Sequence, residues 1–396
     1  MSRLEQQLAD SLCVREKGSR LRRLVIDDSD SIDFSSNDFL GLSRSLKMRN
    51  DYLNELNSMP QILGSTGSRI LTANSKYVED LEQYLSTFHR APSALIFNSG
   101  FDANYSLFST IPQQGDIILY DALIHASIHE GMKHSRAGRL IAFAHSDISD
   151  LKRHIDTLKN TKQNIFVSIE SVYSMDGDVA PLSDIVSLLR SYWPNGENGH
   201  LIVDEAHGTG VFGEHGRGVV QQLNLQDQIF ARLHTFSKAL AGSGAVIFGS
   251  QTLRQYLINY ARPFIFSTYM PYSGLALIKT AYKQLESKET VKAQKHLNAI
   301  IRRFRDTICL PPVAKLLPST GPIQGIILSG TAAVKSFEDY LNSQGFIVKA
   351  VMFPIVPKGE ERIRICFHAH NTVAEIDKFV KCIHQFFRIY YLKSKM

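Results

Sequence analysis

The sequence predicts a two-domain α/β protein, with a mostly parallel sheet in a large domain and a smaller C-terminal α/β domain. The first observation is a series of short apolar runs rich in β-branched residues, which are typical of buried parallel strands. These runs are residues 94–97, 117–120, 165–169, 201–203 and 245–248. The second observation is that helical patterns lie between most of the runs, and this alternation favours a parallel α/β sheet.

Helical patterns also occur before the first run. Residues 3–18 place Leu4, Leu8 and Leu12 four positions apart, which predicts an amphipathic helix at the start of the chain. Residues 75–90 carry apolar side chains on one helical face in the same way. We therefore expect one helix near the N-terminus and another directly before the first strand.

A second, smaller α/β pattern follows the helix-rich segment 252–306. It contains an apolar run at residues 323–328 and another at residues 362–367. A change of pattern of this kind indicates a domain boundary. The predicted parts are an N-terminal helix and arm (residues 1–50), a large ligand-binding domain (51–285) and a small C-terminal α/β domain (286–396).

Composition restricts the class of protein. The chain has 396 residues, of which 44% are hydrophobic and 21% charged, as in ordinary globular proteins. The net charge of +6 could suit nucleic acid, an anionic membrane or an anionic small molecule. The basic residues are spread along the chain, and the densest group, residues 15–23, is typical of the solvated face of a short helix. We therefore predict neither a nucleic-acid nor a membrane partner.

Cysteine usage and the chain termini bear on the compartment. None of the four cysteines forms a C-x-x-C pair, so the sequence predicts neither a zinc site nor a disulfide framework. No apolar run is long enough to cross a bilayer, and we expect a soluble protein in a reducing compartment. Ser394-Lys395-Met396 resembles the peroxisomal address S-K-L. We predict a peroxisomal location, with the cytoplasm as the alternative.

Polar or small residues follow the predicted strands at the points where they end. In open α/β sheets, ligands bind at the carboxyl ends of the strands, so these residues are expected to share one cleft. They are Ser99, Gly100, Glu170, Ser174, Asp204 and His207, with Phe101 next to Gly100. Ser237 and Lys238, which lie just before residues 239–242, are expected in the same cleft.

Two of these positions, Lys238 and Asp204, suggest specific chemistry. Lys238 lies in a small and partly apolar setting, and burial would lower its pKa and make the amine nucleophilic. An exposed surface lysine is the more common situation for this residue type. The string Asp-Glu-Ala-His at residues 204–207 occurs in helicases, but a helicase requires a phosphate loop of the form G-x-x-x-x-G-K-[ST]. The sequence contains no such loop, which excludes that class. Asp204 is then either a buried carboxylate that caps a turn or a partner for a protonated ring nitrogen.

Two further motifs remain ambiguous by themselves. His125 is either a packed core residue or a ring that stacks on an aromatic ligand. Residues 64–69, Gly-Ser-Thr-Gly-Ser-Arg, are either an ordinary loop or a cradle for a phosphate, and their spacing matches no nucleotide fingerprint.

The order of the motifs along the chain is more specific than any one of them. Together they resemble the α-oxoamine synthase family of fold-type I pyridoxal-phosphate (PLP) enzymes over roughly residues 30–375. The motifs are residues 36–42, 64–69, 98–101, 125–127, 173–178, 204–208, 235–238, 266–268 and 362–364.

The resemblance implies PLP as the cofactor and assigns roles around it. Lys238 resembles the lysine that forms the Schiff base, Asp204 the partner of the pyridine nitrogen, and His125 the residue stacked on the ring. With His207, these three form the predicted catalytic set. The other predicted cofactor contacts are His207 and Ser174 near the phenolic oxygen, the backbone of Gly100 and Phe101, the phosphate ligand Thr235, and Thr268 from the second subunit of a homodimer.

The resemblance also implies the substrates, a small amino acid and an acyl-CoA or acyl-carrier thioester. Asn37 and Arg364 resemble the residues that hold the amino-acid carboxylate. The motifs most resemble the family member that joins L-alanine to a pimeloyl thioester in biotin synthesis. In that member an arginine of the N-terminal helix meets the distal carboxylate of the acyl chain, and Arg22 is the matching position. The alternative for Arg22 is a solvated charge in a basic cluster.

Other interpretations share part of this pattern. Glycine C-acetyltransferase and other α-oxoamine synthases use the same core residues with different substrates. A non-catalytic subunit with the same fold would typically lack the Schiff-base lysine, whereas Lys238 and Asp204 are both present here. The sequence therefore predicts an active acyltransferase and leaves the acyl chain open.

Overall fold

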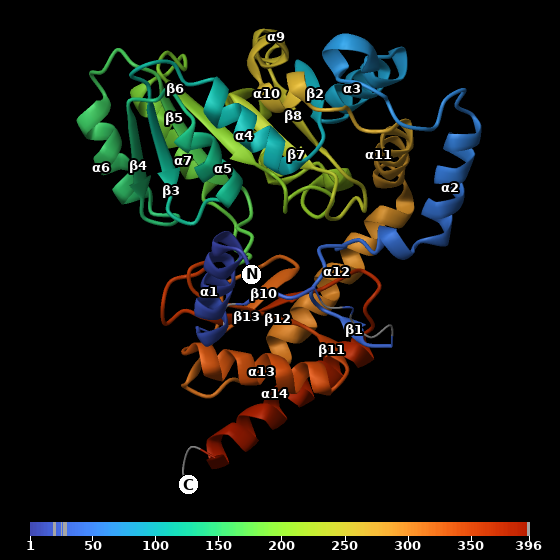
Figure 1. Cartoon of the computed structure of the whole chain (residues 1–396), viewed down its shortest axis with the longest axis vertical. Coiled ribbons are helices and arrows are strands. Elements are labelled where there is room, and N and C mark those ends of the chain that lie inside the picture. Colours follow the sequence, from blue (N-terminus) through green and yellow to red (C-terminus); the bar gives the residue numbers. More distant parts are fainter. Residues whose placement is uncertain (19–20, 25, 27–29, 394–396) are drawn as a thin grey trace.

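A computed structural model describes residues 1–18, 21–24, 26 and 30–393, and it confirms the predicted α/β fold. A large sheet with helices on both faces lies above a smaller domain built from the C-terminal part of the chain (Figure 1). The large sheet has the strand order β2-β8-β7-β6-β5-β3-β4. Its strands are β2 (Ser93–Phe97), β3 (Ile117–Asp121), β4 (Arg139–Phe143), β5 (Ile165–Glu170), β6 (Gly199–Asp204), β7 (Ala231–Thr235) and β8 (Ala245–Gly249).

The sheet is mostly parallel, as predicted, with one exception. Strands β4, β3, β5, β6 and β7 pair in parallel, whereas β8 runs antiparallel to both of its neighbours, β7 and β2. Because two reversals restore the direction, β2 points the same way as β7. The carboxyl ends of β2, β3, β5, β6 and β7 therefore meet at one edge of the sheet.

Both faces of the sheet are buried, which explains its nearly continuous apolar strands. Successive residues point to opposite faces, so Val167 and Val203 belong to one core while Phe166 and Ile202 belong to the other. The helices of this domain are α3 (Lys76–Phe88), α4 (Gly100–Thr110), α5 (Ala126–Lys133), α6 (Ile148–Leu158), α7 (Leu182–Tyr192), α8 (Val219–Gln222), α9 (Gln251–Tyr260), α10 (Arg262–Phe266) and α11 (Tyr272–Leu285).

The small domain contains a four-stranded antiparallel sheet with the order β12-β13-β10-β9. Its strands are β9 (Ala314–Leu316), β10 (Ile323–Leu328), β12 (Lys349–Val351) and β13 (Arg362–Cys366). Its helices are α12 (Lys288–Thr307), α13 (Thr331–Ser343) and α14 (Val373–Lys393). The predicted boundary between residues 285 and 286 falls between α11 and α12.

The N-terminal arm contributes to both domains. Helix α2 (Leu46–Asn57) packs on α11 of the large domain. Strand β1 (Ile32–Asp33) pairs in parallel with β11 (Phe346–Ile347) of the small domain. Phe34 follows β1 and stacks on Phe346 with ring centroids 5.8 Å apart. The arm therefore pairs with a strand of the small domain that lies about 310 residues later in the sequence.

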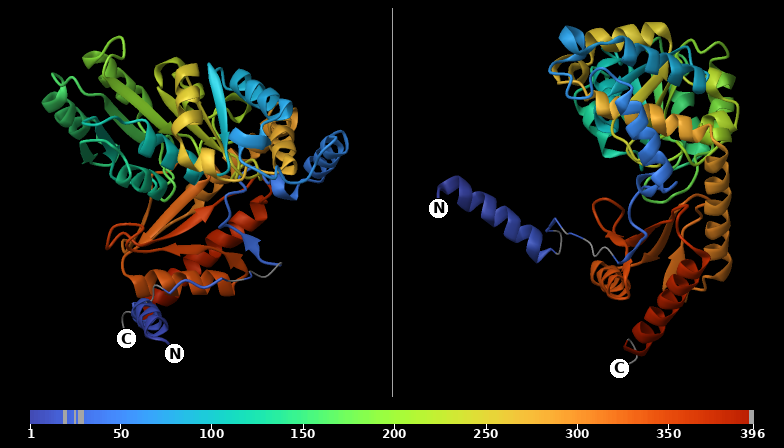
Figure 2. Two further views of the ribbon diagram at one scale, coloured as in Figure 1. Left: turned by 45° about the horizontal axis from the view of Figure 1, so that its top comes forward. Right: turned by 90° about the vertical axis from the view of Figure 1, so that its right-hand side faces the viewer.

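Helix α1 (Arg3–Lys17) forms where the leucine spacing predicts it, and it begins with a capping box between Ser2 and Glu5. None of its residues is buried, and the leucines of its apolar face are all more than half exposed. Figure 2 shows the helix projecting from the body of the molecule. Its apolar face is thus uncovered in the single chain.

Within the described residues, no helix combines the length and the apolar character needed to span a membrane. The predicted peroxisomal address, Ser394-Lys395-Met396, lies outside the described residues. The peroxisomal location therefore stays a prediction.

A tight turn after β5 of the large domain contacts the small domain. Gly177 adopts a φ of +73°, and its carbonyl accepts a hydrogen bond from the hydroxyl of Ser319 at 2.7 Å. A Cβ atom at Gly177 would lie only 2.1 Å from the carbonyl oxygen of Ile323. The turn thus needs glycine for two reasons, its left-handed backbone and its close approach to the small domain.

Gly177→Ala should lower the free energy of unfolding by about 3 kcal/mol, since it combines left-handed strain with a backbone clash. Gly196→Ala is the matched control, because Gly196 has the same φ of +73° and a Cβ added there would meet no atom within 4 Å. That control should lose only about 1 kcal/mol. Urea unfolding of both variants, followed by circular dichroism, compares them. Equal losses would mean that the contact with Ile323 carries no cost.

Candidate active site

The shared edge of the large sheet brings most of the predicted site residues together. Each one lies at or directly after the carboxyl end of a strand, as expected for an α/β ligand site. Gly100 and Phe101 follow β2, His125 follows β3, Ser174 follows β5, Asp204 and His207 end and follow β6, and Thr235 and Lys238 end and follow β7.

Asp204 is buried, and its carboxylate is held in one orientation. Its Oδ2 accepts a hydrogen bond from the side-chain amide of Asn104 at 2.7 Å, and its Oδ1 accepts one from the backbone N–H of Ala206 at 2.8 Å. The amide of Asn104 also lies 3.0 Å from the hydroxyl of Ser127. Asn104 was not singled out from the sequence, because a lone polar residue on a buried helical face carries no motif.

Lys238 lies in the loop after β7 and is partly buried. Burial lowers the pKa of its amine from the ordinary value to about 8, although the negative charge of Asp204 opposes that shift. A large fraction of the amine is therefore neutral near pH 8. This is the state in which a lysine can act as a nucleophile or a base.

His125 is the N-cap of α5 and is linked to Asp204 through a short chain of hydrogen bonds. Its Nδ1 lies 2.7 Å from the hydroxyl of Ser127, which in turn contacts Asn104. Burial of the ring nitrogens lowers the pKa of His125, which favours the neutral imidazole. Its side chain is nevertheless exposed at the strand ends, so one ring face is free to stack on a planar ligand.

His207 and Glu170 bring unpaired polar atoms to the same place. Both side chains are buried, and His207 Nδ1 and Glu170 Oε1 have no hydrogen-bond partner. Burial holds the pKa of His207 well below its usual range. Burial and the neighbouring Asp204 hold the pKa of Glu170 well above its usual range. Both groups are therefore neutral, and each leaves a buried polar atom available for a hydrogen bond with a ligand.

The start of α4 offers backbone donors for an anion. The N–H groups of Gly100 and Phe101 belong to the first turn, whose donors have no partner within the helix. The hydroxyl of Thr235 lies beside this turn, 3.4 Å from where a Cβ of Gly100 would be, and 3.0 Å from the hydroxyl of Ser237. Backbone donors at a helix N-terminus, together with two hydroxyls, suit a phosphate.

Arg364 comes to this site from the small domain. Its NH2 donates to the side-chain oxygen of Asn37 at 2.9 Å, and its Nε donates to the backbone carbonyl of Ser174 at 2.7 Å. The positive charge of Arg364 is among the causes that lower the pKa of Lys238, which places the two cations close to each other. Asn37 and Arg364 are therefore joined by a hydrogen bond, as residues of one site would be, and their predicted role in holding a carboxylate stays a prediction.

Comparisons with known proteins identify the family. A family model described as aminotransferase class I and II matches residues 29–383. The 8-amino-7-oxononanoate synthase of Emericella nidulans is 44% identical over 394 residues, which cover 96% of this chain and 95% of that protein. The chain belongs to the α-oxoamine synthase family of fold-type I PLP enzymes. The resemblance found in the sequence is thus confirmed.

Two other proteins are similar along most of the chain. An aminoacyl transferase, sphA, of Byssochlamys spectabilis is 35% identical over 383 residues, covering 91% of this chain and 81% of that protein. A serine palmitoyltransferase from S. paucimobilis, solved with a PLP–myriocin adduct, superposes with a TM-score of 0.85. It is 23% identical and covers 99% of this chain and 100% of its own, and this likeness supports the fold.

Family membership confirms two further predictions: the chain is a PLP-dependent acyltransferase, and its cofactor is PLP. The residues at the strand ends suit this cofactor. An anchored carboxylate can pair with a ring nitrogen, an exposed imidazole can stack on the ring, and the first turn of α4 can hold a phosphate. Lys238 supplies the amine for covalent attachment.

Two predicted residues of this α-oxoamine synthase come from segments other than the strand ends. Thr268 is exposed, and its backbone carbonyl accepts a hydrogen bond from Asn98 of the same chain at 2.8 Å. Arg22 lines a cavity of about 570 Å3 between the N-terminal segment and the small domain, with Arg15, Met352 and Phe353 among its other walls. The roles assigned to Thr268 and Arg22 stay predictions.

Lys238 in the cofactor-free protein should react with pyridoxal at a rate that rises with pH through about 8 and then levels off, since only the neutral amine attacks an aldehyde. An ordinary lysine, with a pKa of about 10.4, would continue to gain reactivity up to that value. Borohydride trapping followed by peptide mass analysis measures the rate at this residue, and Lys238→Ala provides the blank. A rate that still climbs at pH 10 would contradict the lowered pKa.

Proposed function

We propose that this enzyme catalyses the decarboxylative condensation of L-alanine with a pimeloyl thioester to give 8-amino-7-oxononanoate, a step of biotin synthesis. The observation that carries the proposal is the 44% identity to an 8-amino-7-oxononanoate synthase over nearly the whole of both chains. The amino-acid site supports it, because Asn37 and Arg364 offer a carboxylate partner beside Lys238.

PLP, when bound, supplies an electron sink that stabilises negative charge at the α-carbon of the amino acid. The chain's part is to hold the reacting groups in place. Asp204, fixed by Asn104, is the anchored negative charge that keeps a ring nitrogen protonated. Arg364 holds the carboxylate of the amino acid and thereby orients its α-carbon.

Lys238 is the group proposed to move the proton. With a pKa of about 8, its amine is available near neutral pH to take a proton from the α-carbon and to return one after decarboxylation. His207 is neutral and has an unpaired Nδ1, so it can exchange a hydrogen bond with a nearby oxygen without adding charge. The thiol leaves when the α-carbon bonds to the acyl carbon.

Arg22 is proposed to meet the distal carboxylate of the pimeloyl chain. The cavity that it lines has apolar walls at Met352, Phe353 and Ile355, which suit the methylene groups of an acyl chain. Arg15 lines the same cavity. An apolar cavity that contains cations fits an acyl chain whose far end is negatively charged.

A second candidate is a condensation that uses an acyl thioester without a distal carboxylate. The 35% identity to the aminoacyl transferase sphA favours it, as does the fold shared with a serine palmitoyltransferase. Glycine C-acetyltransferase remains the alternative with the shortest acyl group. Every member of the family uses the same core residues around Lys238, so the acyl site must determine which acyl thioester is used.

Thiol release by the PLP-loaded enzyme should be confined to pimeloyl-CoA with L-alanine, in a panel that also contains acetyl-CoA with glycine and palmitoyl-CoA with L-serine. The expected selectivity rests on the charge at the far end of the acyl chain. Release with palmitoyl-CoA and L-serine alone would support the second candidate, and release with acetyl-CoA and glycine alone would support an acetyltransferase.

Arg22→Gln should raise the KM for pimeloyl-CoA by about tenfold, the effect of losing roughly 1.4 kcal/mol of binding energy, while PLP binding stays unchanged. Arg23→Gln is the matched control, because Arg23 is exposed and pairs with Glu16 rather than lining the cavity. Steady-state kinetics of both variants measures the difference. Equal KM values in the two variants would remove Arg22 from the acyl site.

We also propose that the enzyme works as a homodimer, with Thr268 completing the phosphate site of the other subunit. An exposed apolar surface supports this: it consists of Ile62, Leu63, Ile70, Leu71 and Phe266. The surface comes from two segments of the chain, residues 62–71 and the segment around Phe266. A hydrogen bond joins them, because the N–H of Tyr272 donates to the carbonyl of Leu63 at 3.2 Å. A second copy of the chain would cover this surface beside Thr268.

Mixing two inactive variants tests the shared site. If Thr268 acts across the interface, a heterodimer of Lys238→Ala and Thr268→Ala chains contains one site with both defects and one intact site. Unfolding and refolding the mixture should therefore restore up to about a quarter of the wild-type rate, since half of the random dimers are mixed and each has one of two sites intact. Sedimentation checks that dimers form. No recovery from a dimeric mixture would place Thr268 in its own subunit's site.

A further inference from the structure

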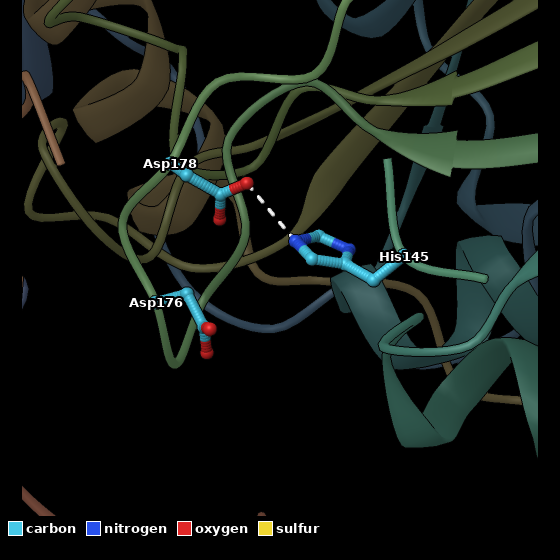
Figure 3. Close-up of side chains that lie close together, drawn as sticks. All are labelled: His145, Asp176 and Asp178. Carbon is cyan, nitrogen blue, oxygen red and sulfur yellow. Dashed lines mark hydrogen bonds and ion pairs between the residues drawn. The ribbon is translucent and has the colours of Figure 1, made fainter. Parts of the chain in front are cut away.

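A cluster of His145, Asp121, Asp176 and Asp178 lies next to the site but takes no part in the proposed chemistry. His145 lies between β4 and α6, and Asp121 is the last residue of β3. Asp176 and Asp178 belong to the turn after β5, residues 173–178, which we call the connecting turn. Figure 3 shows His145 pointing toward Asp178, with Asp176 on the same side of the turn.

Both ring nitrogens of His145 are engaged by carboxylates. Nδ1 lies 2.9 Å from Asp121 Oδ1, and Nε2 lies 3.0 Å from Asp178 Oδ2. Burial alone would lower the pKa of His145, but these two hydrogen bonds raise it to about 10. The ring is therefore an imidazolium that donates to both sides. Although the donor atoms of His145, Asp176 and Asp178 lie within 4.8 Å of one another, an imidazolium has no lone pair for a metal ion.

The other side of the connecting turn holds the small domain. Asp176 Oδ1 accepts a hydrogen bond from NH1 of the buried Arg362 at 2.5 Å. The carbonyl of Ser174 accepts one from Nε of Arg364 at 2.7 Å. With the bond from Ser319 to Gly177, three parts of the turn contact the small domain. The position of Arg364 thus depends on where this turn lies.

The partners of His145 in the large domain also lead to the cofactor site. Asp121 is fully buried, and its oxygens accept hydrogen bonds from the backbone N–H groups of Leu123 and Ser146, both at 2.9 Å. The segment after Asp121 carries His125, the proposed stacking residue. The ring of Tyr173 meets that of His145 edge to face at 4.4 Å, which fixes the imidazolium from the side.

We propose that His145 is a positioning residue: its ring bridges Asp121 and Asp178, and thereby holds the connecting turn where it places Arg364 over the amino-acid site. Through its two hydrogen bonds, His145 links the segment that carries His125 to the turn that is hydrogen-bonded to β13. Without it, the turn keeps its bonds to the small domain but loses its charged tie to the large one. Arg364 then shifts relative to Lys238, since the two are on different domains.

The inference rests on the proposed function, because it concerns the residue that holds the amino-acid carboxylate. His145→Gln removes the positive charge and the two opposed ring N–H donors, so it should raise the dissociation constant for L-alanine at least tenfold, as Arg364 moves away from the amino-acid site. PLP should bind as in the wild type, because His145 contacts none of the proposed cofactor residues. Both quantities are read from the absorbance of bound PLP, titrated with L-alanine in the absence of any acyl thioester.

Asp178→Asn and the double variant test the bridge as a unit. Each single change should weaken L-alanine binding, and the double variant should be no weaker than His145→Gln, since groups that act together are not additive. Arg303→Gln is the matched control: it breaks a two-bond ion pair with Asp377 inside the small domain, at 2.8 and 3.0 Å, and should leave the dissociation constant unchanged.

The possible outcomes separate this inference from the proposed function. Weaker L-alanine binding with normal PLP content and a normal thermal midpoint supports the positioning role. Wild-type affinity in His145→Gln and Asp178→Asn overturns it, as does loss of PLP from either variant. If the wild-type protein binds glycine or L-serine instead of L-alanine, the proposed substrate is wrong, and the same comparison is made with that amino acid.

Discussion

A buried negative charge at Asp204 is the constraint around which the rest of the site is organised. A carboxylate that has left water needs partners, and here one side chain and one backbone N–H supply them. Burial and the charge of Asp204 together hold the pKa of Glu170 well above its usual range, so Glu170 stays neutral. Desolvation lowers the pKa of the Lys238 amine, and the charge of Asp204 offsets part of this shift. The pKa is therefore about 8, close to neutral pH. Burial and the charge of this one carboxylate thus together set the protonation state of its neighbours.

The sequence was sufficient for the parts of the fold that depend on apolar periodicity. The five predicted strands form, because each is buried on both faces and therefore appears as a continuous apolar run. Strand β7 was missed because Arg232 and His234 interrupt its run, although both are buried within the sheet. Strand β4 was missed because it lies at the sheet edge, where most of its residues are not buried. Burial on both faces, rather than strand propensity, made the other strands recognisable.

The same limit applies to the site. Residues at the ends of the predicted strands, such as Asp204, could be predicted, because the sheet direction determines where they meet. Thr235 and Lys238 end and follow the missed strand β7, so the family resemblance was needed to place them. Asn104 and His145 could not, since their roles come from contacts with residues 100 and 33 positions away. Arg364 was found only through the family resemblance. Its placement depends on the packing of two domains, and no local pattern in β13 contains that information.

Helix α1 contributes nothing to the core, and this has a consequence for how such an enzyme diverges. Residues buried in the large sheet are constrained by close packing, where even one methylene is felt. No residue of α1 is buried, so substitutions in α1 leave the packing of the two domains unchanged. Because Val14 and Arg15 of α1 line the cavity next to the small domain together with Arg22, this wall of the cavity can change without repacking the protein core. With the acyl chain proposed to lie in this cavity, preference for one acyl chain over another could change through such substitutions while the residues around Lys238 stay the same.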